Sequence, residues 1–261
     1  MEAIHARGLE IAFERNGTGP TLVLVHGAGD DHRVWRAQLD GLADACTVVA
    51  WDEPGSGRSA DIPSGFGLAD YADCLAAVIE AVGEPAVVCG ISWGGTVVLE
   101  LCRRHPALVS ALVLADTYAG WQGSLPEPEV AARVAAAEAH LTGPRDGSVF
   151  AWGLFAGEPP AEHVPLLRQL ATSARPATLR AQVAIMASTD LREVLARIAV
   201  PTLLVWGDRD ARSPLAVARE FGRVIPHSSL VVLPHCGHLS NMEQPEAFNR
   251  AVRQFCGSLS A

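Results

Sequence analysis

The segment Gly90-Ile91-Ser92-Trp93-Gly94-Gly95 decides the fold, because it joins a run typical of a buried strand to one typical of a helix. The preceding run from Ala86 to Ile91 is continuously apolar, as strands covered on both faces are. A sharp strand-to-helix turn would hold Ser92 in a strained conformation with its hydroxyl exposed, and the flanking glycines would let neighbouring backbones pass close by. The amino end of the helix favours negative charge at the same point. The segment therefore predicts a nucleophilic serine.

Short apolar runs elsewhere predict the other strands of a parallel sheet, with helical patterns between them. The predicted strands cover Thr21–Val25, Thr47–Trp51, Ala86–Ile91, Leu108–Ala115, Thr202–Trp206 and Leu230–Leu233. The predicted helices cover Leu68–Val82, Thr96–Arg104, Ala216–Val224 and Ala247–Phe255. Leu9 to Phe13 alternates in polarity and leads to Asn16-Gly17, which indicates an edge hairpin. Strands that alternate with helices in this way predict an α/β fold with helices on both faces of the sheet.

One stretch interrupts the alternation. From Trp121 to Leu195 the sequence has alanine-rich helical pieces and no convincing strand. These pieces are separated by prolines at positions 126, 128, 144, 159, 160, 165 and 176. We interpret residues 119–195 as a helical cap inserted after the strand that leads to Asp116, with residues 1–118 and 196–261 forming the core. At the carboxyl ends of the strands a cap would cover the usual ligand crevice. The alternative is a set of helices packed elsewhere on the sheet.

A serine hydroxyl is a poor nucleophile until a base removes its proton, and His238 is the predicted base. It lies in the run Leu233-Pro234-His235-Cys236-Gly237-His238, just after the last predicted strand. A loop there can return the ring to the carboxyl edge of the sheet. His235 is the near alternative, but Gly237 beside His238 suits a loop that turns a ring inward.

The base needs a carboxylate to fix its tautomer and stabilise the imidazolium. Three aspartates follow predicted strands, namely Asp116, Asp208 and Asp210, and all three lie between the serine and the histidine. Asp210 is one step further into its loop than Asp208 and is freer to reach the histidine, whereas Asp208 is expected to hydrogen-bond its own turn. We therefore predict Asp210 as the acid, with Asp116 and Asp208 as alternatives.

An oxyanion formed at the serine would need hydrogen-bond donors. The N–H group that follows the nucleophile belongs to Trp93, and a second should come from the loop after the first core strand. That loop is His26-Gly27-Ala28-Gly29, so Ala28 is the predicted second donor.

Charge and composition exclude several classes of function. The formal net charge is −9, which argues against nucleic acid as a partner. All 20 cationic residues are arginines, so a lysine Schiff base, a Walker-type phosphate loop and a Ser-Lys dyad are excluded. We expect a small-molecule substrate instead.

The cysteines and the first residues of the sequence allow predictions about metal binding and about cellular location. Cys236 lies beside His235 and His238, but no second close-spaced ligand pair accompanies it, so we expect no metal and no cofactor. The six cysteines form no C-x-x-C pair and read as reduced core residues. The start lacks the features of a signal peptide, and no apolar run reaches membrane-spanning length. The expectation is a cytoplasmic protein without a membrane partner.

Together these motifs resemble the α/β-hydrolase superfamily over nearly the whole chain. The resemblance rests on His26-Gly27, the run from Asp52 to Ser59, the serine turn, Gly207-x-x-Asp210 and Gly237-His238. It implies a mostly parallel eight-stranded sheet with the cap inserted after the sixth strand, and it implies Asp210 as the acid. The loop from Asp52 to Ser59 looks structural in that family.

Within the superfamily the chain looks most like small capped hydrolases: 3-oxoadipate enol-lactonases, carboxylesterases and carbon–carbon bond hydrolases. Two positions depart from the usual patterns of those relatives. Trp93 stands where methionine is commoner in the enol-lactonase branch, although Ser92-Trp93-Gly94 also occurs in proline iminopeptidase-like members of the superfamily. Glu53-Pro54 replaces a more usual aromatic or arginine pair. Haloalkane dehalogenases and epoxide hydrolases place a carboxylate at the position of Ser92, so their reactions are excluded.

The predicted function is cleavage of a small ester, thioester or enol-lactone through an acyl-enzyme on Ser92. Carbon–carbon hydrolysis or cofactor-free peracid formation by the same residues is the alternative, and a non-catalytic ligand-binding protein is a third reading. Four cap aromatics are candidates to contact the substrate. They are Trp121 and Trp152, with Phe150 and Phe155 beside them in sequence.

Overall fold

The computed structural model describes residues 1–143 and 153–259. Its eight strands form one sheet in the order β1-β2-β4-β3-β5-β6-β7-β8. The strands are β1 (Glu2–Ala6), β2 (Leu9–Asn16), β3 (Thr21–Val25), β4 (Thr47–Trp51), β5 (Ala86–Ile91), β6 (Val109–Ala115), β7 (Thr202–Gly207) and β8 (Ser228–Leu233). Strands β3 to β8 pair in parallel, whereas β2 is antiparallel to β1 and β4. The predicted mostly parallel eight-stranded sheet is confirmed.

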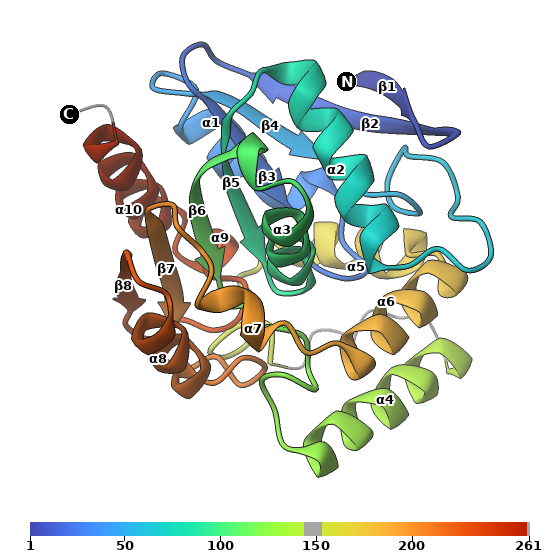
Figure 1. The fold of residues 1–261 in the computed structure, drawn as a ribbon. Helices are drawn as coiled ribbons and strands as arrows, with labels where there is room; N and C mark the ends of the chain where they lie inside the picture. Colours follow the sequence, from blue (N-terminus) through green and yellow to red (C-terminus); the bar gives the residue numbers. More distant parts are fainter. Residues whose placement is uncertain (144–152, 260–261) are drawn as a thin grey trace.

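Helices cover both faces of this sheet (Figure 1). The helices of these two layers are α1 (Arg36–Gly41), α2 (Leu68–Val82), α3 (Trp93–Arg104), α8 (Leu215–Val224), α9 (Ser240–Glu243) and α10 (Pro245–Ser258), with short 3-10 turns at His32–Trp35 and Pro106–Leu108. Val23 and Val25 of β3 pack in one core with α2, α3 and α8, while Leu22 and Leu24 pack in a second core with α1 and α10. The alternation along β3 thus places the chain's central strand between two apolar layers.

Several predicted strands and helices differ from the structure by one to three residues at their ends, and two differences have a clear structural reason. Helix α3 begins at Trp93 rather than Thr96, because the chain enters the helix directly after Ser92. The edge hairpin exists, but its turn lies at Arg7-Gly8, where both residues have positive φ, and it joins β1 to β2. Gly17 instead directly follows the end of β2. A side chain at this position would press on the backbone of the loop before β4, so only glycine fits there.

Where the structure describes the segment between β6 and β7, its regular elements are helices, as predicted. It contains α4 (Glu127–Thr142), α5 (Val164–Ser173), α6 (Pro176–Ser188) and the short α7 (Arg192–Leu195). Prolines stand in the first turns of α4, α5 and α6, where a missing N–H costs no hydrogen bond. Helices α4 and α6 lie side by side, apart from the layer that α2 and α3 form on the sheet (Figure 1). None of the helices within residues 1–143 and 153–259 is long and apolar enough to cross a membrane.

Candidate active site

The turn between β5 and α3 holds Ser92 in a strained conformation, with φ 54° and ψ −126°. The two flanking glycines, Gly90 and Gly94, allow the neighbouring backbone segments to approach closely. A Cβ on Gly90 would lie 2.7 Å from backbone atoms of Gly94, and one on Gly94 would press on the carbonyl oxygens of Val25 and His26. The first turn of α3 therefore packs directly against the end of β3, and the serine is left at the carboxyl edge of the sheet.

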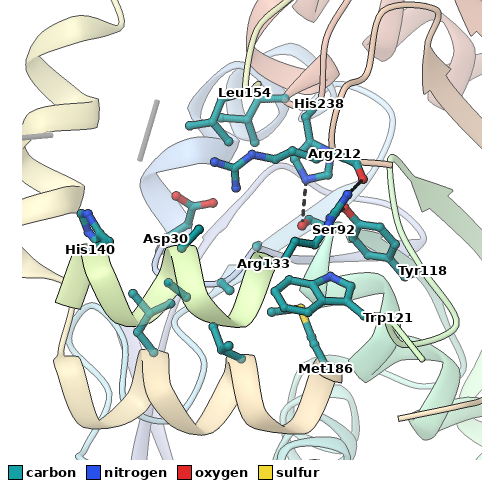
Figure 2. A pocket seen from close by; sticks show the side chains of 17 residues that line it. Asp30, Ser92, Tyr118, Trp121, Arg133, His140, Leu154, Met186, Arg212 and His238 are labelled. Atoms are coloured by element: carbon teal, nitrogen blue, oxygen red, sulfur yellow. Dashed lines mark hydrogen bonds between the residues drawn. The ribbon is translucent and has the colours of Figure 1, made fainter. Parts of the chain in front are cut away.

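A chain of hydrogen bonds leads from Ser92 through His238 to Asp210. The Ser92 Oγ lies 2.8 Å from His238 Nε2 (Figure 2). On the other side of the ring, His238 Nδ1 lies 2.8 Å from Asp210 Oδ2. This pattern fits a neutral ring that donates from Nδ1 to the carboxylate and accepts the serine proton at Nε2. Burial lowers the pKa of His238 below its ordinary value, although Asp210 opposes the shift. The ring is therefore neutral, and free to accept a proton, near pH 7.

The loop after β7 fixes the acid in place. Besides meeting His238, Asp210 accepts hydrogen bonds at Oδ1 from the N–H groups of Arg212 and Ser213, at 2.7 and 2.8 Å. Its two oxygens are thus divided between its own turn and the histidine. This arrangement holds the carboxylate rigidly against the ring, as an orienting acid requires.

The alternatives weighed from the sequence lie elsewhere. The Asp116 carboxyl accepts from the Gly207 N–H at 2.9 Å and from the Ser240 hydroxyl, and burial raises its pKa well above the ordinary value. Asp208 is exposed and accepts from the Cys236 N–H at 3.3 Å, in the neighbouring loop rather than in its own turn as predicted. His235 is also exposed, and its Nδ1 lies 2.6 Å from Arg209 Nη2. None of these side chains is hydrogen-bonded to Ser92 or His238.

The predicted oxyanion donors flank the serine. Ala28 lines the same pocket as Ser92, and Trp93 is the first residue of α3, where N–H groups have no partner within the helix. Neither N–H donates to an acceptor in the part of the chain that the structure describes. The His26 ring stiffens the loop before Ala28, since its Nδ1 bonds the Gly27 carbonyl at 2.8 Å. Its Nε2 accepts from the Glu53 N–H at 3.2 Å.

A pocket of about 180 Å³ opens over Ser92 and His238, between the carboxyl edge of the sheet and the helices α4 and α6. Its apolar wall comes mainly from Trp121, Leu154, Leu179, Val183, Met186 and Leu239. The predicted Trp121 is among these residues (Figure 2), whereas Phe155 stacks on His163 in the core and is not. Trp152 and Phe150 lie outside the described residues.

The pocket also holds charged groups that the sequence analysis missed: Asp30, Arg133 and Arg212. Arg133 lies over the rings of Tyr118 and Trp121 and donates to the Tyr118 hydroxyl at 2.9 Å. Burial raises the pKa of Asp30 to about 7. Asp30 could have been noticed from its place in the loop after β3. Arg133 gives no such signal, because it is one of several polar residues on an alanine-rich helix.

One group in the described residues has the donor atoms for a metal ion: Asp31, His32 and Asp52. Its donors are already occupied. Asp52 accepts from His32 Nδ1 at 2.7 Å and from the Arg58 N–H at 2.8 Å, while Asp31 pairs with Arg33 at 2.7 Å. The Asp52 loop therefore has a structural explanation, as the sequence predicts.

Known proteins resemble this chain over nearly its whole length. A curated relative from Vibrio cholerae, named a pimeloyl-[acyl-carrier protein] methyl ester esterase, is 30% identical over 95% of this chain and 98% of its own. The solved structure of a thermophilic esterase from Thermogutta terrifontis, with malate bound, has a TM-score of 0.88, 30% identity and complete coverage of both chains. An enol-lactonase from Burkholderia xenovorans has a TM-score of 0.87 at 22% identity, over 98% of this chain and 100% of its own.

The family model described as "Alpha/beta hydrolase family" matches residues 22–251. That range contains the serine turn, the acid loop, the histidine loop and the helical segment between β6 and β7. The chain belongs to the alpha/beta hydrolase family.

Proposed function

We propose that this protein is a serine esterase that hydrolyses small carboxylic esters in the pocket above Ser92. The observation that carries the proposal is the hydrogen-bonded chain Ser92–His238–Asp210, which ends at the floor of a largely apolar pocket. An activated serine next to two unpaired N–H groups is the arrangement that acyl transfer requires.

The reaction follows from these contacts. His238 Nε2 takes the proton of Ser92 as the hydroxyl oxygen attacks the ester carbonyl carbon, and Asp210 stabilises the imidazolium that forms. The N–H groups of Ala28 and Trp93 receive the oxyanion. His238 then protonates the departing alkoxide, and it later activates a water molecule that cleaves the acyl-enzyme and restores Ser92.

The size and wall of the pocket support a small, mainly apolar acyl group. Its volume of about 180 Å³ is below the range of roughly 300–1,000 Å³ that is common for drug-sized ligands. In this proposal residues 119–195 form the cap, since α4 and α6 close the pocket over the serine. The relatives named as esterases favour an ester over the other bonds that such a site can cleave.

Labelling with an organophosphate tests the nucleophile. We expect one phosphoryl adduct per chain, on Ser92, with loss of activity toward p-nitrophenyl acetate and butyrate, and we expect no adduct in Ser92→Ala. A Ser92→Ala variant with full esterase activity would refute the mechanism. A protein that cleaved an enol-lactone or a vinylogous diketone, or formed peracid, but did not cleave simple esters would refute the substrate class.

A further inference from the structure

Three polar side chains with no solvent exposure meet beneath the nucleophile turn: Glu53, Trp93 and Gln182. They come from the loop after β4, the first turn of α3 and the middle of α6. The Trp93 Nε1–H donates to Glu53 Oε2 at 2.7 Å, and the Gln182 side-chain amide is hydrogen-bonded to Glu53 Oε1. Glu53 thus bridges the element that carries Ser92 and a helix that closes the pocket.

The first of these bonds compensates for the burial of a carboxyl group. Glu53 and Trp93 are 40 residues apart in the chain. A buried carboxyl group is costly unless it is hydrogen-bonded, so an indole N–H at this point compensates for the glutamate. The bond therefore explains how the glutamate is accommodated without contact with solvent.

We propose that Glu53 is a positioning residue, which fixes Trp93 beside the nucleophile and ties helix α6 to the same turn. The inference rests on the proposed esterase function, because the N–H of Trp93 matters there as an oxyanion donor. A donor helps only if it is held in place before charge develops, and an error of about 1 Å can cost on the order of a hundredfold in rate.

The second bond of Glu53 extends this control to the pocket wall. Gln182 lies on α6 among Leu179, Val183 and Met186, which line the pocket. Loss of the Gln182 contact should therefore loosen the acyl wall, whereas loss of the Trp93 contact should loosen the oxyanion donor. A looser acyl wall should mainly raise KM, and a looser oxyanion donor should mainly lower kcat.

The surroundings of Glu53 favour its neutral form. Burial raises the pKa of Glu53 well above its ordinary value, and His26 Nδ1, 3.8 Å from the carboxyl group, belongs to a ring whose own pKa burial lowers. Glu53 accepts both of its bonds, from the Trp93 Nε1–H at Oε2 and from the Gln182 side-chain N–H at Oε1. A glutamine at position 53 keeps a carbonyl oxygen that can accept from Trp93, and its NH2 group can donate to the Gln182 carbonyl oxygen, which has no partner in the described residues, once the Gln182 amide turns over.

The experiment compares Glu53→Met with Glu53→Gln on p-nitrophenyl butyrate. We expect E53M to lower kcat by about tenfold to a hundredfold and to raise KM as Gln182→Met does, because it removes both bonds, and we expect E53Q to restore most of kcat. Trp93→Phe removes the same hydrogen bond from the other side and should also lower kcat, so it carries the test if E53M does not fold. Gln182→Met should raise KM more than it lowers kcat.

Tyr71→Phe is the matched control. The Tyr71 ring packs edge-on against the Trp93 ring, with 5.3 Å between the ring centroids. The buried Tyr71 hydroxyl has no hydrogen-bond partner in the described residues. Y71F thus changes a neighbour of the same indole without removing a bond, and kcat should stay at the wild-type level.

Organophosphate labelling of every variant separates the two proposals. Failure to label Ser92 in the wild type would refute the esterase proposal. If E53M or W93F is folded, is labelled and has the wild-type kcat, the proposed role of Glu53 is wrong while the esterase proposal stands. An E53Q variant as impaired as E53M would also overturn the role of Glu53, because the hydrogen bonds would then not be what matters.

Discussion

At the residue level, Asp210 and Asp116 are both buried aspartates at the carboxyl edge of the sheet, yet only Asp210 contacts His238. The pair therefore provides a matched test of the acid. Asp210→Asn should lower kcat by about 10⁴-fold, because an amide cannot hold the ring in the required tautomer. Asp116→Asn should retain most activity, because burial already favours the neutral form of Asp116. Steady-state kinetics of both variants decides the assignment, and equal losses would contradict it.

The protonation of His238 predicts the pH dependence of the reaction. The base acts in its neutral form, and burial lowers its pKa below the ordinary 6.5. For a neutral ester, kcat/KM should therefore stay constant as the pH falls from 8 toward about 6.5, and should decline only below that value. The fall occurs as the ring gains its proton. A measured midpoint above pH 7 would show that burial does not control this group.

Asp30 predicts a separate pH effect that depends on the charge of the substrate. Its carboxyl group lines the pocket, and burial raises its pKa to about 7. As the pH rises through 7 this group becomes negative, so KM for an ester with an anionic acyl chain should increase, while KM for a neutral ester stays level. Asp30→Asn should abolish the increase. The comparison uses monomethyl succinate and methyl butyrate, and the same KM profile for both esters would contradict the prediction.

At the level of elements, glycines decide how closely β3 and α3 approach. A Cβ at Gly94 would press on the carbonyl oxygens of Val25 and His26, which are backbone atoms and cannot turn aside. Gly94→Ala should therefore lower the thermal midpoint and displace the Ala28 loop, with loss of activity. The control is Gly222→Ala in α8, where the nearest atom is a Leu204 methyl at 3.7 Å.

Gly222→Ala should raise the free energy of unfolding by about 0.5–1 kcal/mol, since glycine is a poor residue for a helix interior. Chemical denaturation of both glycine variants measures the difference. A G94A protein as stable and active as wild type would mean that the close approach of β3 and α3 is not required.

The properties of the strands and their loops explain how much of the structure could be predicted from the sequence. Parallel strands are marked by apolar runs, so β5, β7 and the edge strand β8 were predicted to within two residues. The loops that follow them and carry Ser92, Asp210 and His238 were located in the same way. The turn at Arg7-Gly8 was misplaced because Asn16-Gly17 is an equally good local turn signal. The bond between Glu53 and Trp93 has no local signal at all. It arises because parallel strands bring distant loops to one edge of the sheet.

At the level of the whole molecule, two bridges fasten the pocket helices to the core. Arg133 of α4 donates to the Arg212 carbonyl in the acid loop at 2.5 Å, and Gln182 of α6 bonds Glu53 beneath the serine turn. The walls of the pocket are therefore held by the loop that carries Asp210 and by the Glu53 loop, which is bonded to Trp93 in the turn after Ser92. Acyl specificity and chemical rate are coupled for this reason, and a change in the wall that leaves both bridges intact should alter specificity alone.

Met186 offers such a change. It lies on α6 in the pocket wall, near Trp121, and takes part in neither bridge through its side chain (Figure 2). Met186→Ala would remove several side-chain atoms and lengthen the space for the acyl group. Each methylene that becomes buried contributes about 0.8 kcal/mol, so kcat/KM should rise roughly threefold to fourfold per added carbon for hexanoate and longer esters.

Turnover of p-nitrophenyl acetate by Met186→Ala should change much less, because a short acyl group does not reach the new space. Val134→Ala is the control, since Val134 is 38% exposed on α4 and lies outside the pocket wall. Its profile across acetate, butyrate, hexanoate and octanoate esters should match that of the wild type. If M186A kept the wild-type chain-length profile while V134A shifted it, the acyl group would not lie against α6, and the pocket would have to be assigned to the leaving alcohol instead.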